Sequence, residues 1–431
     1  MRLFYNLLFC VFFLLSAPYY FWKMWRRGNW RTGFGQRFGF FSRSFRESLR
    51  NKKCIWLHAV SVGEVNVCVP FVKALQEQMP DHHFVISTTT ATGMGELMRK
   101  LPPTMTRIYY PVDLWIIVAR ALRVVNPVAV ILVEAEIWPN FLWQVKDRKL
   151  PLYLVNARLS ESSFRGYRRF GFLFRKLFGG FDGVGAQSES DAERWAEIGV
   201  RPEAISVTGN MKFDAVRIDS TPSLDVPGLL AGLNVPIDAQ ILMGCSTHSG
   251  EEALLARVYL KLKSRFPKLF LCLVPRHMER APSVSRDLEA LGVRYRLRFP
   301  KSETNSKSGK DLDCLLVNST GELIDFCRVA TIVFVGKSLT SRGGQNPIEP
   351  AALGKPLIFG PNMQNFRGIA EQFIANGSAR VVRDELELWE FLDDVLTRES
   401  ALQVAGNAAR VVVEANSGAT DRSIAMLKPL L

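Results

Sequence analysis

The sequence predicts two α/β units of the doubly wound type, each built on a parallel sheet. The chain has 431 residues, which is long for a single hydrophobic core, so we expect two domains. Short runs of β-branched and apolar residues alternate with segments of helical periodicity, as in parallel sheets covered by helices. Polar residues gather directly after several of these runs, where open parallel sheets bind ligands. The two units would therefore face each other across a ligand-binding cleft.

The N-terminal segment is apolar enough to enter a membrane. Phe4–Trp22 holds no charged residue and has about the length needed to span a bilayer. A cleavable signal peptide is one alternative, but its basic region would be Arg2 alone and residues 16–18 (SAP) make a poor cleavage site. We expect residues 1–22 to be a membrane anchor. A helix lying flat in the membrane interface is the second alternative.

Basic residues follow the apolar segment at once, which by the positive-inside rule places the rest of the chain on the cytoplasmic side. Residues 31–45 alternate basic and aromatic side chains, as an anionic membrane surface would favour. We therefore assign residues 23–52 to a basic, aromatic, membrane-proximal segment. Ser162–Phe178 has the same character, with an ordinary helix that has a solvated basic face as the alternative.

The overall charge indicates an acidic partner. The formal charge is +14, which fits nucleic acid, anionic lipid or a phosphorylated substrate. Nucleic acid is disfavoured, because no zinc, RRM-like or helix-turn-helix signature occurs. The seven cysteines are scattered and form no CxxC pair, which favours reduced thiols over disulfides or a cysteine metal site.

The first α/β unit is expected over residues 53–214. A helix is predicted over Val65–Gln78 from its apolar stripe. Polar residues end several strands, as in the stretches around Glu64, Glu134 and Lys212. The predicted strands cover residues 55–62, His83–Ser87, Val128–Val133, Leu152–Val155, Gly183–Ala186 and Ile205–Val207.

A linker is expected over residues 215–236, where periodicity is lost and three prolines occur. The second α/β unit would then occupy residues 237–431. Residues 298–313 are predicted to be an exposed loop rich in lysine and serine. The predicted strands are Gln240–Gly244, Leu269–Val274, Leu315–Val317, Thr331–Val335 and Pro356–Phe359, and a helical tail is predicted over Ala401–Glu414 and Ala419–Leu427.

An anion-binding site is predicted after the strand that ends at Val335. A loop with Gly343-Gly344 leads to a short helix with Asn346 as N-cap and Pro347 at its first position. Free backbone N–H groups and the helix dipole would point at this loop. Glu349, at the third helical position, suits a ribose hydroxyl. The alternative is a capping box, in which Glu349 bonds back to the N-cap backbone.

Carboxylates and a lysine at strand ends are the candidates for catalysis. Glu64 follows a glycine, and a carboxylate in an apolar cleft can have the raised pKa needed of a general base. A helix-start carboxylate favoured by the dipole is the structural alternative for Glu64. Spacing does not choose between Glu134 and Glu136, but Glu134 stands at the end of the apolar run. Lys212 could neutralise a leaving phosphate, unless it is a surface cation.

The sequence gives no indication of a metal or a bound cofactor. The five histidines form no HExxH motif or i,i+4 pair. The one Asp-x-Asp, Asp311-Leu312-Asp313, adjoins the lysine- and serine-rich loop and does not end a strand that enters the cleft. No Walker A lysine motif or GxSxG turn occurs. We therefore predict that the protein uses neither a metal nor a cofactor.

Ten short motifs occur in an order that resembles the 3-deoxy-D-manno-octulosonic acid (Kdo) transferases of lipopolysaccharide synthesis. They are WLHAVSVGEV, STTTATG, YYPVD, VEAEIWPN, LVNARLS, TGNMKFD, STHSGEE, LVPRH, GEL and GGQNPIEP. The match runs from about residue 25 to about residue 373. The resemblance implies a GT-B fold, CMP-Kdo as donor and a lipid A precursor (lipid IVA) as acceptor. It also implies a signal-anchored enzyme at the cytoplasmic face of the bacterial inner membrane.

The same resemblance assigns roles to particular residues. Glu64 would be the base, and Glu134 and Lys212 would assist the transition state. Gln345 departs from the histidine that is usual in this family. The implied CMP contacts are Pro275, Arg276, the turn Gly321, Glu322 and Leu323, and the helix start Asn346, Pro347, Ile348 and Glu349.

Two other interpretations are compatible with the residue patterns. A nucleotide-sugar epimerase or hydrolase could share the two-unit fold, but it would act on a soluble substrate and would need no anchor. A non-enzymatic, membrane-tethered nucleotide-binding scaffold would tolerate replacement of Glu64 and Lys212.

A leaving nucleoside monophosphate, as in CMP-Kdo, carries fewer charges than a diphosphate, so cationic side chains and helix N-termini could suffice without metal.

Overall fold

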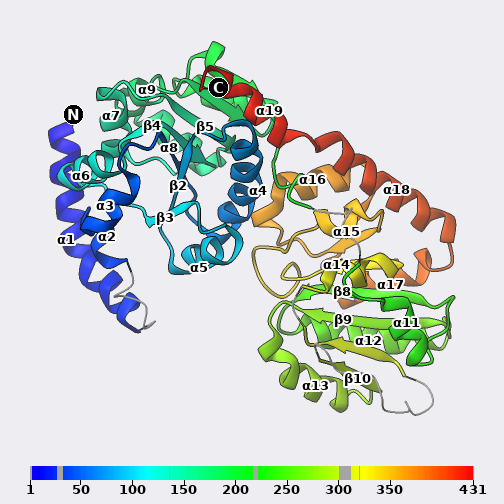
Figure 1. Cartoon of the computed structure of the whole chain (residues 1–431). Helices are drawn as coiled ribbons and strands as arrows, with labels where there is room; N and C mark the ends of the chain where they lie inside the picture. Colours follow the sequence, from blue (N-terminus) through cyan, green and yellow to red (C-terminus); the bar gives the residue numbers. More distant parts are fainter. Residues whose placement is uncertain are drawn as a thin grey trace. The chain divides into compact units, whose positions relative to one another are not determined.

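The structure is a computed structural model that describes residues 2–26, 33–134, 136–216, 222–299, 312–319 and 321–430. The chain forms two compact units (Figure 1). Unit 1 contains residues 1–215 and 417–431, and unit 2 contains residues 216–416. Each unit is built on one seven-stranded sheet whose neighbouring strands are parallel. The predicted fold class of two doubly wound units is confirmed.

Unit 1 has the strand order β3-β2-β1-β4-β5-β6-β7. Alternate residues of β1 enter different cores: Trp56 packs on one side of the sheet and Leu57 on the other. Both faces are therefore buried, which explains the continuous apolar runs in the sequence. The strands are β1 (Cys54–His58), β2 (His83–Thr88), β3 (Thr106–Tyr109), β4 (Pro127–Val133), β5 (Leu152–Ala157), β6 (Gly183–Ala186) and β7 (Ile205–Val207).

The helices of unit 1 connect these strands and cover both faces of the sheet (Figure 1). They are α1 (Arg2–Arg26), α2 (Phe34–Arg37), α3 (Arg43–Leu49), α4 (Val62–Gln78), α5 (Ala91–Lys100), α6 (Trp115–Val125), α7 (Pro139–Asp147), α8 (Glu161–Arg169), α9 (Gly171–Phe178), α10 (Glu189–Glu197) and α19 (Ala419–Met426).

Unit 2 has the strand order β10-β11-β9-β8-β12-β13-β14. Its strands are β8 (Gln240–Thr247), β9 (Leu269–Pro275), β10 (Tyr295–Arg298), β11 (Cys314–Val317), β12 (Ile332–Val335), β13 (Leu357–Phe359) and β14 (Ala379–Val381). Its helices are α11 (Val226–Gly232), α12 (Glu251–Lys263), α13 (Ala281–Ala290), α14 (Leu323–Val329), α15 (Ile348–Ala352), α16 (Arg367–Ala375), α17 (Glu385–Val395) and α18 (Glu399–Asn416).

The C-terminal helix α19 belongs to unit 1, so the predicted extent of the second domain, 237–431, is wrong at its end. Ile424 and Leu427 are buried in the core that α4 also lines. The Asp214 carboxylate accepts hydrogen bonds from the backbone N–H groups of Gly418 at 2.8 Å and Thr420 at 2.6 Å. Apolar burial and this cap hold α19 to the unit in which the chain began.

The predicted linker, 215–236, is also shorter than expected. Val226 and Leu230 of α11 are buried in unit 2. Residues 217–221 of the predicted linker lie outside the described residues. The predicted exposed loop, 298–313, needs a correction as well, because Arg298 ends strand β10 and is only 8% exposed. Residues 300–311 of that loop lie outside the described residues.

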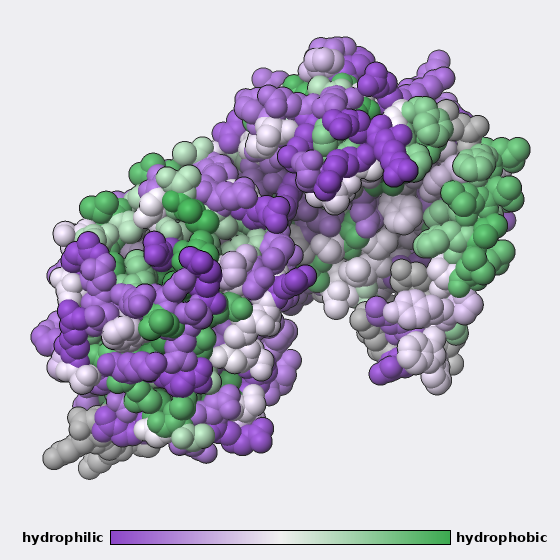
Figure 2. Space-filling model, turned by 180° about the vertical axis from the view of Figure 1, so that it is seen from behind, coloured by the Kyte–Doolittle hydropathy of each residue, from purple (hydrophilic) through white to green (hydrophobic). Residues whose placement is uncertain are grey.

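The basic, aromatic segments contribute some of their aromatic residues to the unit 1 core, while Phe40, Phe170 and Phe172 are exposed. Phe41, Phe164 and Phe178 are buried there, which favours the ordinary-helix alternative for 162–178. Arg31 lies outside the described residues. By length and composition, α1 is the one described helix that could cross a membrane. Figure 2 shows hydrophobic side chains gathered over the edge of unit 1 where α1 lies.

The assignment of α19 to unit 1 predicts which unit loses stability when a buried residue at the end of α19 is truncated. Leu427→Ala should lower the stability of unit 1 by about 2–5 kcal/mol, because the side chain is fully buried. Hydrogen exchange should therefore speed up in β4, while β9 of unit 2 keeps its protection. Leu386→Ala, at a 59% exposed leucine, is the matched control. Faster exchange in β9 rather than in β4 would show that α19 stabilises the other unit.

Candidate active site

The predicted catalytic residues of unit 1 lie at the carboxyl edge of its sheet. Glu64 follows β1 in the first turn of α4, Glu134 follows β4, and Lys212 follows β7. The sheet runs outward in opposite directions from β1 and β4. Such a switch point leaves a crevice between the loops at the carboxyl ends of the two strands, where doubly wound sheets bind ligands.

Glu64 is held by the start of α4. Its Oε2 accepts a hydrogen bond from the Val60 backbone N–H at 2.7 Å, and its Oε1 accepts one from the Ser61 hydroxyl at 3.1 Å. Ser61 is also the N-cap of α4. The structural alternative for Glu64, a carboxylate favoured at a helix start, is thus realised in the fold.

The same surroundings give Glu64 the proton affinity of a base. Burial, together with the negative charges of Glu134 and Glu136, raises the pKa of Glu64 to about 7, against the hydrogen bonds from Val60 and Ser61, which lower it. A carboxyl group with this pKa takes and releases a proton near neutral pH. The capping role and a role as general base are therefore compatible.

Glu134 and Lys212 form an ion pair. Lys212 Nζ lies 3.1 Å from Glu134 Oε1, and each side chain is about one-fifth exposed. Asn156, in the left-handed conformation with φ of 54°, links the two loops. Its side-chain amide donates to Glu134 Oε1 at 3.4 Å, and its Oδ1 accepts from the Met211 backbone N–H at 3.0 Å. Sequence reasoning gave Asn156 no role, although asparagine at a strand end is a signal for left-handed backbone.

Glu136 joins the group through a different partner. Its Oε2 accepts a hydrogen bond from Trp138 Nε1 at 2.8 Å and lies 3.9 Å from His58 Nε2. The His58 ring is buried and stacks on Tyr110, with 3.8 Å between the ring centroids. Because both Glu134 and Glu136 raise the pKa of Glu64, the structure brings all three carboxylates together. The contact between His58 and Glu136 was missed by sequence reasoning.

The predicted donor residues of unit 2 surround a second switch point, between β8 and β12. The Glu251 carboxylate, at the start of α12, is fully buried there. It fixes the loop that follows β12 to the loop that follows β8. It accepts hydrogen bonds from the backbone N–H groups of His248 (2.8 Å), Lys337 (2.8 Å), Ser338 (2.9 Å) and Leu339 (3.0 Å).

Three amides of the glycine-rich loop are used within the protein. The N–H groups of Gly343, Gly344 and Gln345 donate to the carbonyl oxygens of Asn362, Lys337 and Gly336 respectively. The two glycines have φ of 126° and 73°, conformations that L side chains rarely adopt. Their backbone is thus used to shape the loop. These three amides are therefore not available to an anion, and the predicted contribution of the helix start stays a prediction.

Cationic groups gather around His248. Burial and the nearby charges of Lys337, His277 and Arg280 lower the pKa of His248. Gln345 Nε2 lies 3.3 Å from His248 Nε2. The resemblance predicts a histidine at position 345. This chain has Gln345 there, and Gln345 contacts His248 of another loop. Arg280 is ion-paired with the buried carboxylate of Glu252 at 2.6 Å, whereas Lys337 adds a positive charge that suits a phosphate group.

The helix that carries Glu349 begins at Ile348, one residue later than predicted. Asn346 nevertheless caps it, because its Oδ1 accepts from the Ile348 N–H at 3.1 Å. Its side-chain amide donates to Glu349 Oε1 at 3.3 Å, so Glu349 contacts a side chain and not the backbone amide of a capping box. Burial raises the pKa of Glu349, opposed by this hydrogen bond and by the charge of Arg276. Pro347 and Ile348 are buried beside it.

Two further predicted contacts have structural roles. Pro275 ends β9, and the Arg276 N–H donates to the Thr247 carbonyl at 3.1 Å while its side chain is exposed. Glu322 receives two hydrogen bonds from Arg298, at 3.0 and 2.8 Å, which lower its pKa. Gly321 and Leu323 complete this turn, Gly321 with φ of 88° and Leu323 as the first residue of α14. The ion pair with Arg298 fixes the Glu322 side chain, so the backbone of the turn is the part that we assign to ligand contact.

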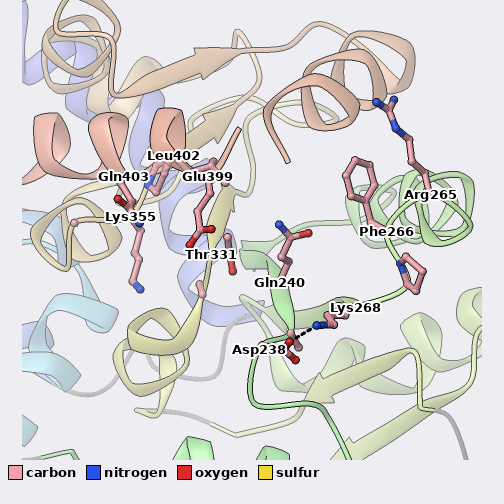
Figure 3. Close-up of a pocket in the computed structure, with 15 residues that line it drawn as sticks. Asp238, Gln240, Arg265, Phe266, Lys268, Thr331, Lys355, Glu399, Leu402 and Gln403 are labelled. Atoms are coloured by element: carbon pink, nitrogen blue, oxygen red, sulfur yellow. Dashed lines mark hydrogen bonds and ion pairs between the residues drawn. The ribbon is translucent and has the colours of Figure 1, made fainter. Parts of the chain in front are cut away.

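A separate cavity in unit 2, of about 810 Å³, lies away from these residues (Figure 3). Gln240, Thr331 and Pro356, which line it, stand at the amino ends of β8, β12 and β13. It is therefore at the opposite edge of the sheet from the donor residues. Among the described residues, no group of three His, Cys, Asp or Glu side chains could hold a metal ion. Asp311 lies outside them, and metal independence stays a prediction.

Comparisons with known proteins agree on one family. A family model described as 3-deoxy-D-manno-octulosonic-acid transferase (kdotransferase) matches residues 32–215. A 3-deoxy-D-manno-octulosonic acid transferase from Haemophilus influenzae is 30% identical over 433 residues, covering 99% of this chain and 96% of the relative. One from Bordetella pertussis is 32% identical over 429 residues, covering 96% and 97%.

Similarity to a solved structure supports the fold but not the function. UDP-GlcNAc 2-epimerase from Neisseria meningitidis bound to UDP-GlcNAc has a TM-score of 0.55 at 12% identity, covering 84% of this chain and 98% of that one. The GT-B-like arrangement of two parallel seven-stranded sheets is thus shared with an epimerase. The fold by itself does not separate a transferase from an epimerase, whereas the sequence relatives do.

The four amide contacts of Glu251 predict its effect on the unit 2 site. Glu251→Gln replaces one acceptor oxygen with an NH₂ group that faces backbone donors, and should cost about 1–3 kcal/mol of unit 2 stability. Hydrogen exchange should speed up at the amides of Lys337, Ser338 and Leu339. Glu371→Gln, at an exposed position of α16, removes the same charge as a control. Unchanged exchange at these three amides would mean that Glu251 does not hold the loop.

Proposed function

The chain belongs to the family of 3-deoxy-D-manno-octulosonic acid (Kdo) transferases, and on this premise we propose that it moves Kdo from CMP-Kdo to a lipid A precursor, lipid IVA, at the cytoplasmic face of the bacterial inner membrane. Kdo transfer makes it a glycosyltransferase of lipopolysaccharide synthesis. The observation that carries the proposed mechanism is Glu64, a carboxyl group with a pKa of about 7 among other charged groups at the ligand edge of unit 1.

The proposed reaction is a direct displacement at the anomeric carbon of Kdo. Glu64 takes the proton from a sugar hydroxyl of the acceptor, and that oxygen forms a bond to the anomeric carbon. The bond from this carbon to the phosphate oxygen of CMP breaks, and CMP leaves with the electron pair. The proton remains on Glu64 until it passes to solvent. Base assistance of this kind typically contributes about 10²–10⁴-fold in rate.

Lys212 would stabilise the charge that develops. Its ammonium group, 3.1 Å from Glu134, is the cation that could meet the Kdo carboxylate or the leaving phosphate. Glu134 and Asn156 then act as positioning residues, since they fix the lysine and the loop that carries it. The carboxylate partner orients the Lys212 ammonium group.

Unit 2 would hold the donor. Glu349 and Asn346 offer hydrogen-bonding groups to ribose hydroxyls at the carboxyl edge of its sheet. The cationic groups near His248, together with Arg276, would neutralise the phosphate of CMP. Pro275 and the backbone of Gly321, Glu322 and Leu323 complete the proposed CMP contacts. One phosphate group could be neutralised by these side chains without a metal ion.

Unit 1 would bind the lipid acceptor and the membrane. Residues 1–215 and 417–431 contain 31 of the 55 basic and 18 of the 41 acidic residues, so unit 1 carries +13 of the net charge of +14. An anionic membrane surface attracts such a domain, while the nearly neutral unit 2 gains little from it. The apolar helix α1 supplies the anchor. Soluble donor and lipid acceptor are thus assigned to different units.

The role of Glu64 predicts both a rate loss and a pH dependence. Glu64→Gln, which is nearly isosteric, should lower turnover by about 10²–10⁴-fold, because the amide takes up no proton. In the unchanged enzyme the base works when deprotonated, so kcat/KM should rise with pH through about 7 and then level off. Kdo transfer to lipid IVA, followed by mass spectrometry of the products, measures both.

Glu77→Gln, at an exposed position of the same helix, is the control and should keep normal turnover. Binding of CMP should survive Glu64→Gln, because the donor site is assigned to unit 2. A Glu64→Gln enzyme with near-normal turnover at saturating substrates would give the role of base to Glu134 or Glu136.

The ribose assignment predicts a loss of donor affinity. Glu349→Gln should weaken CMP binding by about 1–3 kcal/mol, because it removes a charged acceptor of hydrogen bonds. Calorimetry with CMP measures the change on the folded variant, and Glu390→Gln at an exposed position of unit 2 is the control. Unchanged affinity with slightly lower stability would mean that Glu349 only supports the start of its helix.

A further inference from the structure

The first turn of α1 is bonded to the folded body of unit 1. The Arg2 guanidinium donates to both oxygens of Asp147, at 2.6 and 2.8 Å. The Tyr5 hydroxyl donates to the buried carboxylate of Asp113 at 2.8 Å. Asp113 also accepts from two backbone N–H groups at the start of α7, so this contact reaches into the core of the unit.

Further contacts continue along the same side of the helix. The Asn6 side chain donates to Asn140 Oδ1 at 3.1 Å and accepts from its amide at 3.0 Å. Ring contacts then follow in order along α1: Tyr5 meets Trp143 at 5.5 Å between centroids, Phe9 meets Trp138 at 6.4 Å, Phe13 meets Phe38 at 6.4 Å, and Phe21 meets Phe34 at 6.3 Å. The helix therefore lies along unit 1 from its first turn to its last third.

The other side of α1 is apolar and exposed. Leu3 is 85% exposed and Leu15 is 77% exposed, although both are large hydrophobic residues. Figure 2 shows this surface as a continuous hydrophobic area. The exposed apolar residues of α1 are Leu3, Phe4, Leu7, Leu8, Val11, Phe12, Leu14, Leu15, Tyr19, Phe21, Trp22 and Trp25.

Exposed apolar side chains of the body lie next in sequence to the residues that hold α1. Trp115 and Ile116, both more than half exposed, follow Asp113 by two and three residues. At the other end of α1, the guanidinium of Arg26 lies 5.0 Å from the centroid of the Trp22 ring. A tryptophan beside a basic residue is typical of the boundary between acyl chains and headgroups. This surface suits a lipid bilayer that carries anionic headgroups.

A helix that crosses the bilayer conflicts with these contacts. Twenty-five residues of helix are about 37 Å long, so a spanning α1 would put its two ends on opposite sides of a hydrocarbon layer of about 30 Å. Asp147 and Asp113, which bond its first turn, would have to cross with it. Charged groups and a folded body are costly in hydrocarbon. If the contacts broke instead, Asp113 would lose the Tyr5 hydroxyl in a buried setting.

We propose that α1 lies in the plane of the membrane as a monotopic anchor, with its exposed apolar side among the acyl chains of one leaflet and its other side bonded to unit 1. This inference rests on the proposed membrane-bound function and specifies how the membrane is bound. The anchor holds unit 1 against the leaflet that presents the lipid acceptor. A spanning helix would act as a tether and would leave the body free to turn.

Cys10 allows a direct test, because it is exposed on α1 while the other six cysteines are buried. The full chain, labelled at Cys10 with an environment-sensitive fluorophore, is bound to vesicles of phosphatidylethanolamine and phosphatidylglycerol. Quenching by lipids with spin labels at several depths then locates residue 10. The same measurement follows for Leu3→Cys and Trp22→Cys, each in a Cys10→Ser background.

An in-plane helix places all three positions at one shallow depth, about 5–10 Å below the headgroups. A spanning helix places residue 10 near the bilayer centre and residues 3 and 22 near opposite surfaces. In spheroplasts, an impermeant maleimide should fail to label Leu3→Cys from outside, because an in-plane helix does not carry residue 3 to the outer surface. Labelling from outside would overturn the proposal.

The controls separate this inference from the proposed function. Kdo transfer on vesicles is measured for each labelled variant, so that the depth profile is taken from an active enzyme. Normal transfer together with a spanning depth profile would overturn the in-plane anchor alone. Absence of any quenching, with the chain remaining in the soluble fraction, would overturn both the anchor and the proposed membrane partner.

Discussion

The proximity of three carboxylates at one edge of the unit 1 sheet is the constraint on which the rest of the account depends. Glu134 is compensated by Lys212, and Glu136 receives a hydrogen bond from Trp138. Glu64 has no cation bonded to it in the described structure. Burial and the charges of the other two carboxylates therefore raise its pKa to about 7. The hydrogen bonds that cap α4 act in the opposite direction and also fix the orientation of the carboxylate, so one residue serves the fold and the chemistry together.

Unit 2 uses a buried carboxylate in a different way. Glu251 contacts no predicted ligand group, but it joins the loops after β8 and β12 through four backbone amides. Three amides of the glycine-rich loop donate to backbone carbonyl oxygens and so fix the shape of the loop. On the proposed function, the side chains around His248 and Arg276 would bind the anionic donor. Unit 1 would then supply the proton-accepting group and unit 2 the cationic groups.

Sequence patterns predicted the interior strands of both sheets and one edge strand, β7, but not the other three edge strands. The strands that were missed, β3, β10 and β14, each lie at the edge of a sheet. They are short and partly exposed, and residues such as Arg107 and Arg296 interrupt the apolar pattern. A strand with one free edge needs fewer apolar residues, so its signal is weak. The return of α19 to unit 1 was missed for another reason, because contacts between distant segments leave no local pattern.

In the candidate site, too, some features could be predicted from the sequence and others could not. Glu64, Glu134 and Lys212 could be found because residues at the carboxyl ends of parallel strands converge. The link through Asn156 and the contact between His58 and Glu136 depend on backbone conformation and on loops brought together by the fold. The amides of Gly343 and Gly344 illustrate the same limit, since the glycines could be identified from the sequence but their hydrogen-bond partners, Asn362 and Lys337, could not. Local sequence identifies the groups, and tertiary structure decides what each one bonds.

The central claim is that Glu64 exchanges its proton near neutral pH. The direct measurement is a ¹³C NMR titration of the glutamate side-chain carboxyl groups in the intact chain, with the Glu64 resonance assigned from its absence in Glu64→Gln. The account predicts a titration midpoint at about pH 7 for this resonance. A midpoint close to the ordinary value of 4.5 would contradict it, because a carboxylate with so low a proton affinity would be a poor base for the acceptor hydroxyl.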